Sequence, residues 1–168
     1  MNGWKLASLG ALLMVGLAPA SLLADRLAGT LDGKEWQWYI LKEGNDANAT
    51  FTDLGGIYSV DILGVVDPDS WRTRDGFSIS LSVVDGELVD FDVIHLISTT
   101  AMPPVYTSED ADVRLRLESF SVEGNVAHVA GRVDGTLALQ ESLGEPPSLE
   151  EGIEVAVEFD IEALQIEF

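Results

Sequence analysis

Cysteine is absent from this chain of 168 residues, and histidine is scarce. Without cysteine the protein has no disulfide, no catalytic thiol, no iron–sulfur cluster and no zinc site built on thiolates. Histidine occurs only twice, as His95 and His128, and a zinc site would need a third ligand. His95 shares its strand face with apolar neighbours, so we expect a partly buried structural ring. We expect His128 to face solvent, and neither residue predicts a catalytic role.

Basic residues are also few, since nine Lys and Arg stand against 29 Asp and Glu, for a formal net charge of −20 at pH 7. Nucleic acid and anionic lipid are bound through Lys and Arg that neutralise phosphates. We therefore expect this chain to bind neither nucleic acid nor an anionic membrane surface. Its charge favours cations or basic partners, and high solubility is the simplest role for it.

The longest apolar run lies at the N-terminus, where residues 1–24 have the layout of a secretory signal peptide. Lys5 precedes the apolar residues 6–17, and Ala18-Pro19-Ala20 supplies a small-x-small cleavage site, with Leu22-Leu23-Ala24 as a poorer second candidate. The alternative is an uncleaved membrane anchor over residues 6–24, which is near the lower length limit for spanning a bilayer. We expect a signal-peptide helix and an exported protein, periplasmic or extracellular and of bacterial origin.

The rest of the chain has the period of antiparallel β-strands. Residues 77–84, 113–117 and 153–161 each alternate apolar side chains with polar or small ones. The phase slips near Glu118, which predicts a β-bulge. A second slip near Leu164 predicts that the last strand is long and bent.

Short turns separate the apolar runs. Asp32-Gly33, Asp85-Gly86 and Gly124-Asn125 each stand between two of them and predict hairpins. Together with a run at residues 57–66, they indicate about eight strands and no helix after the leader. The sequence predicts a single domain over residues 25–168, an antiparallel β-sandwich, with a β-barrel as the second choice.

Two longer connections are predicted to be loops because each contains a proline pair, which cannot sit in a central strand. Residues 98–112 contain Pro103-Pro104, and residues 141–152 contain Pro146-Pro147. We expect these loops, together with residues 67–71, to be the surfaces that the domain presents to a partner.

Calcium is the only cofactor that the sequence indicates, because it takes six to eight oxygen ligands that loops often supply. The candidate ligands form two clusters, Asp67 with Asp69, and Glu109, Asp110 with Asp112. Neither cluster matches the EF-hand pattern. The simpler interpretation is that these carboxylates are solvated surface charges and bind no specific ion.

Aromatic residues supply a second lead. Trp71 follows the turn at residues 67–70, and Tyr106 follows Pro103-Pro104, so both are candidates for contact with a sugar or a protein partner. Trp36 and Trp38 share one strand face, and we expect them to belong to the core.

No motif names a reaction or a family. The leading hypothesis is an exported, non-enzymatic binding or structural module of undetermined ligand. The first alternative is a Ca²⁺-stabilised carbohydrate-binding or adhesion-type domain. The second is a carboxylate-based hydrolase, for which Asp90 and Asp92 form a pair of suitable spacing on one strand face. With 29 acidic residues such pairs arise by chance.

Overall fold

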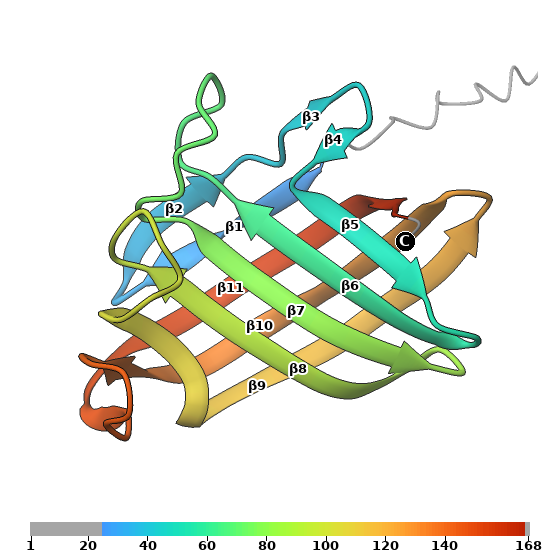
Figure 1. Cartoon of the computed structure of the whole chain (residues 1–168). Helices are drawn as coiled ribbons and strands as arrows, with labels where there is room; N and C mark the ends of the chain where they lie inside the picture. The colour runs from blue at the N-terminus through green and yellow to red at the C-terminus, as the bar shows by residue number, and fades with distance from the viewer. Residues whose placement is uncertain (1–24, 167–168) are drawn as a thin grey trace, which may run out of the picture.

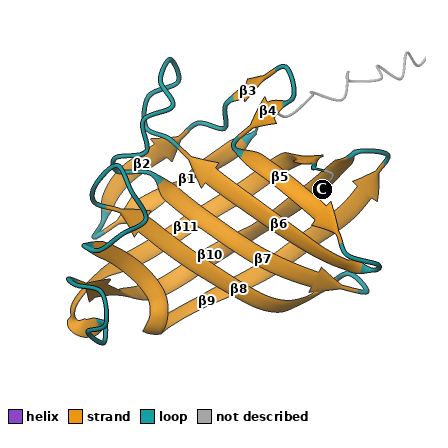
Figure 2. Cartoon of the chain, in the orientation of Figure 1, coloured by secondary structure: helices purple, strands orange, loops and turns teal. Residues whose placement is uncertain are grey.

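The computed structural model describes residues 25–166, and every regular element in that range is a β-strand (Figures 1 and 2). No helix among these residues is long and apolar enough to cross a membrane. The expected signal-peptide helix and its cleavage sites lie outside the described residues. The strands are β1 (Arg26–Leu31), β2 (Lys34–Trp38), β3 (Lys42–Glu43), β4 (Asp46–Ala47), β5 (Ala49–Asp53), β6 (Ile57–Gly64), β7 (Phe77–Val84), β8 (Glu87–Leu96), β9 (Val105–Glu123), β10 (Val126–Gln140) and β11 (Ser148–Gln165).

The strand pairings form a closed circuit. The main sheet has nine strands in the order β10-β9-β8-β7-β6-β5-β11-β1-β2, and β10 also pairs with β11. Its pairings are antiparallel except between β11 and β5, where Leu164 pairs with Thr50 and Gln165 with Phe51. These two residue pairs between β5 and β11 close the circuit. The hairpin of β1 and β2 lies outside this contact, because β1 pairs with an earlier part of β11 (Figure 1). The predicted all-β fold with a large antiparallel sheet is confirmed.

The three predicted hairpin turns are also confirmed, because they join β1 to β2, β7 to β8 and β9 to β10. At the first turn φ is 47° at Asp32 and 73° at Gly33. Positive φ at both central residues gives a two-residue turn whose twist matches that of the paired strands. Gly33 adopts this conformation without the steric cost that a Cβ would add.

One hydrophobic cluster fills the space between the strands. Phe77, Ile79, Leu81 and Val83 of β7 are buried, as their alternation with serine predicts. Trp38 is 1% exposed, and the ring of Trp36 stacks on it with centroids 5.8 Å apart. The expectation that this pair belongs to the core is confirmed for Trp38, while Trp36 is a partly buried ring packed against the core.

The bulge predicted near Glu118 is confirmed. Ala130 pairs with Ser119 and Gly131 with Leu117, which leaves Glu118 unpaired between them. The second predicted slip is wrong, because β11 keeps its alternation through Ala163 and pairs with β10 without a shift from residue 153 to 164. Ala163 pairs with Ala127 and both are fully buried, so the inward position at residue 163 holds a small side chain, and the larger Leu164 does not take its place.

The two predicted loops are shorter than expected. β9 begins at Val105, directly after Pro103-Pro104, and β11 begins at Ser148, directly after Pro146-Pro147. Each proline pair therefore precedes a strand, where a missing N–H breaks no ladder. The expectation that residues 105–112 and 148–152 are loop is wrong.

Candidate functional site

Trp71 and Asp69, predicted as candidates for different roles, lie together in one groove. The loop between β6 and β7 supplies both residues, and the other wall comes from β3 and the residue before it. Trp71 is 45% exposed, and it is the one tryptophan among the exposed large hydrophobic residues of the described part of the chain. The groove has a volume of ≈ 260 Å³ and is lined by Leu41, Lys42, Glu43, Pro68, Asp69 and Trp71.

Short-range hydrogen bonds shape the loop that carries Trp71. Asp67 Oδ1 accepts a hydrogen bond from the backbone N–H of Asp69 at 3.0 Å, and Ser70 Oγ accepts one from the N–H of Arg72 at 3.3 Å. Asp and Ser side chains stabilise turns in this way without help from a regular strand. Asp67 therefore has a structural role in the turn, and the Trp71 ring is left to face solvent.

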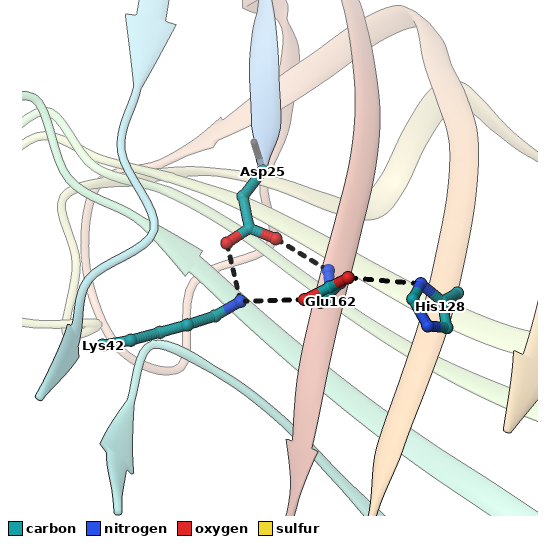
Figure 3. A network of polar contacts seen from close by, with 4 residues as sticks. All are labelled: Asp25, Lys42, His128 and Glu162. Atoms are coloured by element: carbon teal, nitrogen blue, oxygen red, sulfur yellow. Dashed lines mark hydrogen bonds and ion pairs between the residues drawn. The ribbon is translucent and has the colours of Figure 1, made fainter. Parts of the chain in front are cut away.

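Lys42, on the opposite wall, is held in a polar network that Figure 3 shows. Its Nζ lies 2.7 Å from Asp25 Oδ2 and 3.9 Å from Glu162 Oε2. Asp25 Oδ1 accepts a hydrogen bond from the backbone N–H of Glu162 at 2.7 Å, and Glu162 Oε1 lies 3.7 Å from His128 Nδ1. The lysine thus has a fixed position, and its charge is balanced by carboxylates of the fold itself.

The five calcium candidates lie on two different elements. Asp67 and Asp69 are in the β6–β7 loop, as expected. Glu109, Asp110 and Asp112 were expected in a loop as well, but they lie in strand β9. Glu109 and Asp110 lie where the β9–β10 pairing is interrupted, since Thr107 pairs with Ala138 and Asp112 with Thr136. No group of three or more acidic or histidine side chains between residues 25 and 166 is placed to hold a metal ion. Calcium binding stays a prediction.

Tyr106, expected in a loop, lies in β9 and is half-buried, so that placement is wrong. Its ring stacks on that of His95 with centroids 6.1 Å apart. His95 is 7% exposed, and its Nδ1 lies 3.2 Å from the carbonyl oxygen of Gly76, which can only accept, so Nδ1 carries the proton. Burial lowers the pKa of His95 below its ordinary value, against the opposing effects of the Gly76 carbonyl and of the Asp75 charge. Both rings therefore have a packing role.

Asp90 and Asp92 lie on the outer face of β8, over a depression of ≈ 80 Å³ that serines of β6 and β7 share. Ligand pockets usually measure roughly 300–1,000 Å³. Asp92 Oδ1 accepts a hydrogen bond of 2.6 Å from Ser108 Oγ, which links β8 to β9. The depression offers too little volume to enclose a sugar ring between two carboxylates.

A larger surface depression was not anticipated from the sequence. It is a trough of ≈ 550 Å³ on the outer face of the sheet, formed by β1, β2, β10 and β11. Its lining residues are Arg26, Ala28, Gly29, Thr30, Glu35, Trp36, Gln37, Arg132, Ala156 and Glu158. The signal in the sequence is faint: Ala28 and Ala156 occupy outward strand positions that usually carry larger polar side chains.

No family model matches the chain, and no curated protein or solved structure is similar enough to match it. Its function therefore has to be inferred from the chemistry of its own surfaces. The groove at Trp71 combines an exposed aromatic ring with charged side chains, and the trough is a wider hollow lined by arginines, carboxylates and small residues.

Proposed function

We propose that this chain is an exported, non-enzymatic binding module that holds a neutral glycan in the groove at Trp71. The observation that carries the proposal is the exposed indole of Trp71 beside Asp69, Lys42 and Glu43 in a single groove. Flat aromatic rings stack on the apolar face of a sugar, while neighbouring carboxylates and amines exchange hydrogen bonds with its hydroxyl groups.

The volume and charge of the groove favour a neutral ligand of small size. At ≈ 260 Å³ and open to solvent, the groove is slightly smaller than most ligand pockets, so it suits a small ligand such as a single sugar ring. The net charge of −20 disfavours nucleic acid, anionic lipid and other polyanions as ligands. Since Asp25 and Glu162 already balance Lys42, the groove offers no free positive charge to an anion.

The fold supports binding at the surface and not in an interior cavity. Of the two architectures that the sequence predicts, we favour the β-barrel over the sandwich, because the pairings return to their starting strand. Small barrels fill their interior with side chains, and the buried cluster here includes Trp38, Phe51 and Phe77. Export rests on the leader sequence alone.

The test is a titration of intrinsic tryptophan fluorescence of the full chain with a panel of neutral oligosaccharides. We expect at least one member of the panel to quench or shift the emission, and Trp71→Ala to abolish that response. Leu143→Ala is the matched control, because Leu143 is also exposed, at 66%, but lies in the β10–β11 loop. A response that persists in Trp71→Ala, or no response to any member of the panel, would contradict the proposal.

A further inference from the structure

The trough on the outer face of the sheet has a floor of small side chains. Glu158 of β11 pairs with Ala28 of β1, and in the next row Ala156 pairs with Thr30. Side chains this short leave a hollow between longer neighbours on the same face. The hollow measures ≈ 550 Å³, within the usual range for a site that holds a small molecule.

Two arginines stand in the walls of this trough, Arg26 from β1 and Arg132 from β10. The trough therefore holds two of the nine basic residues of the chain, beside Glu35 and Glu158 of the same lining. A third basic residue, Arg116, lies directly opposite Arg132 in the β9–β10 pairing. Like charges in a cross-strand pair destabilise a sheet, so the pair serves no evident structural purpose by itself.

The guanidinium of Arg132 is incompletely satisfied by the protein. Its Nε is buried and has no hydrogen-bond partner. Its contacts with Asp134 Oδ1 and Glu158 Oε1 are both 4.0 Å, which is longer than a hydrogen bond. An arginine carries five donors in a rigid fork that matches a carboxylate. Arg132 therefore retains donor capacity that a carboxylate in the trough could use.

Glu158 lies between the two arginines. One of its oxygens is 3.4 Å from Arg26 Nη2 and the other is 4.0 Å from Arg132 Nη2. All three side chains are well exposed, so these ion pairs contribute little to stability and can be exchanged for others. Glu158 thus occupies the position that an external carboxylate would take.

We infer that the trough is a second binding site, for a small organic molecule with one carboxylate group. The carboxylate binds between Arg132 and Arg26 and displaces Glu158, and the uncharged body of the ligand lies on Ala28 and Ala156. The ligand is small and singly charged because the net charge of −20 repels a polyanion. This site is separate from the groove at Trp71 and does not depend on the glycan proposal.

The experiment follows arginine Nε–H signals of the full chain in ¹H–¹⁵N NMR spectra during titration with benzoate. Benzamide, which has the same shape without the charge, and inorganic phosphate, which lacks the apolar body, are the comparison probes. We expect benzoate to shift the Arg132 signal, identified by its loss in Arg132→Met, and the two other probes to shift it much less. Isothermal titration calorimetry measures the affinity for benzoate in the variant that lacks the Arg132 signal.

Two variants move affinity in opposite directions. Arg132→Met should weaken benzoate binding about tenfold, because a charge-assisted bidentate pair is lost. Glu158→Gln should strengthen it by about threefold, because the competing carboxylate is removed. Glu150→Gln removes the same charge from an exposed position near the start of β11 and should leave the affinity unchanged. The inference would be overturned if benzamide shifted the Arg132 signal as much as benzoate, or if phosphate shifted it more than benzoate. Weaker binding of benzoate by Glu158→Gln would overturn it as well.

Discussion

Lys42 Nζ lies 2.7 Å from Asp25 Oδ2, and this contact attaches the residue before β1 to strand β3 (Figure 3). The same carboxylate accepts the backbone N–H of Glu162, a residue 137 positions later in the chain. Asp25 directly follows the predicted signal peptide, so the first residue of the predicted mature domain is already fixed in the fold. One side chain thus joins β1, β3 and β11.

Replacement of Asp25 should therefore destabilise the fold. Asp25→Ala leaves the partly buried N–H of Glu162 without its acceptor, and we expect a loss of about 1–3 kcal/mol in the free energy of unfolding. Asp25→Asn keeps an acceptor oxygen and should lose less. Urea denaturation measures both, with Glu150→Ala as a control expected to stay within about 0.5 kcal/mol of the unmodified chain. Equal losses for Ala and Asn would show that the charge, and not the acceptor, matters.

His95 should make stability depend on pH. Burial lowers its pKa in the folded state, so between the folded and unfolded pKa values the unfolded chain binds the proton more readily. The contribution is fully present above the unfolded pKa of about 6.5 and is lost as pH falls toward the folded pKa.

We expect the free energy of unfolding to fall between pH 7.5 and pH 5, and His95→Gln to make that slope shallower by removing the titrating group. Chemical denaturation at a series of pH values provides the measurement. His128→Gln, at a half-exposed position, is the comparison. An unchanged slope in His95→Gln would assign the pH dependence to other groups.

Gly64 marks a close approach between β6 and the β1–β2 hairpin. A Cβ at this position would meet the side chain of Leu27 and the Cβ of Trp38, and both residues are fully buried or nearly so. Gly64→Ala should cost about 1–3 kcal/mol, the usual penalty for overpacking a core. Thermal unfolding detects the change, and Ser82→Ala on the outer face of β7 serves as a control. A neutral Gly64→Ala would mean that the hairpin can move away from β6 without loss.

Thermal unfolding in the presence of Ca²⁺ tests the five acidic residues that the sequence indicates as calcium candidates. We expect millimolar Ca²⁺ and Mg²⁺ to shift the midpoint of thermal unfolding equally, relative to EDTA at fixed ionic strength. The reason is that the five candidate acids are divided between the β6–β7 loop and β9, and that Asp67 forms part of a turn. A specific site at 100 times its dissociation constant would add about 2.7 kcal/mol. A shift of several degrees with Ca²⁺ alone would therefore contradict this expectation and lead back to those acids.

The strands that could be predicted are those in which large apolar residues alternate with polar ones, such as β7, and those bounded by a two-residue turn, such as β1 and β2. β5 was missed because only Ala49 and Phe51 face inward there, too few for a visible period. The first residues of β9, 105–112, were predicted to be loop. Their acidic side chains interrupt the alternation of apolar and polar residues, and the pairing of β9 with β10 is interrupted there as well.

The groove at Trp71 was predicted only in part. An aromatic residue beside acidic ones in a turn indicates an exposed ring, and Trp71 is exposed. Nothing in the sequence places Lys42 and Glu43 against that turn, because the contact depends on how β3 folds over from a distant part of the chain. The trough is harder still to anticipate, since its walls come from four strands whose order the sequence does not reveal.

The closure of the strand circuit has a consequence for how the chain acquires its structure. β11 is the common neighbour of β1, β5 and β10, so strands made early have no partner on that side until β11 follows. Such non-local pairing slows folding, because the long intervening loop must be closed first. A chain that crosses a membrane from its N-terminus onward would therefore remain unfolded for most of the passage. In the export that we propose for this chain, the topology would delay folding until β11 has emerged on the far side.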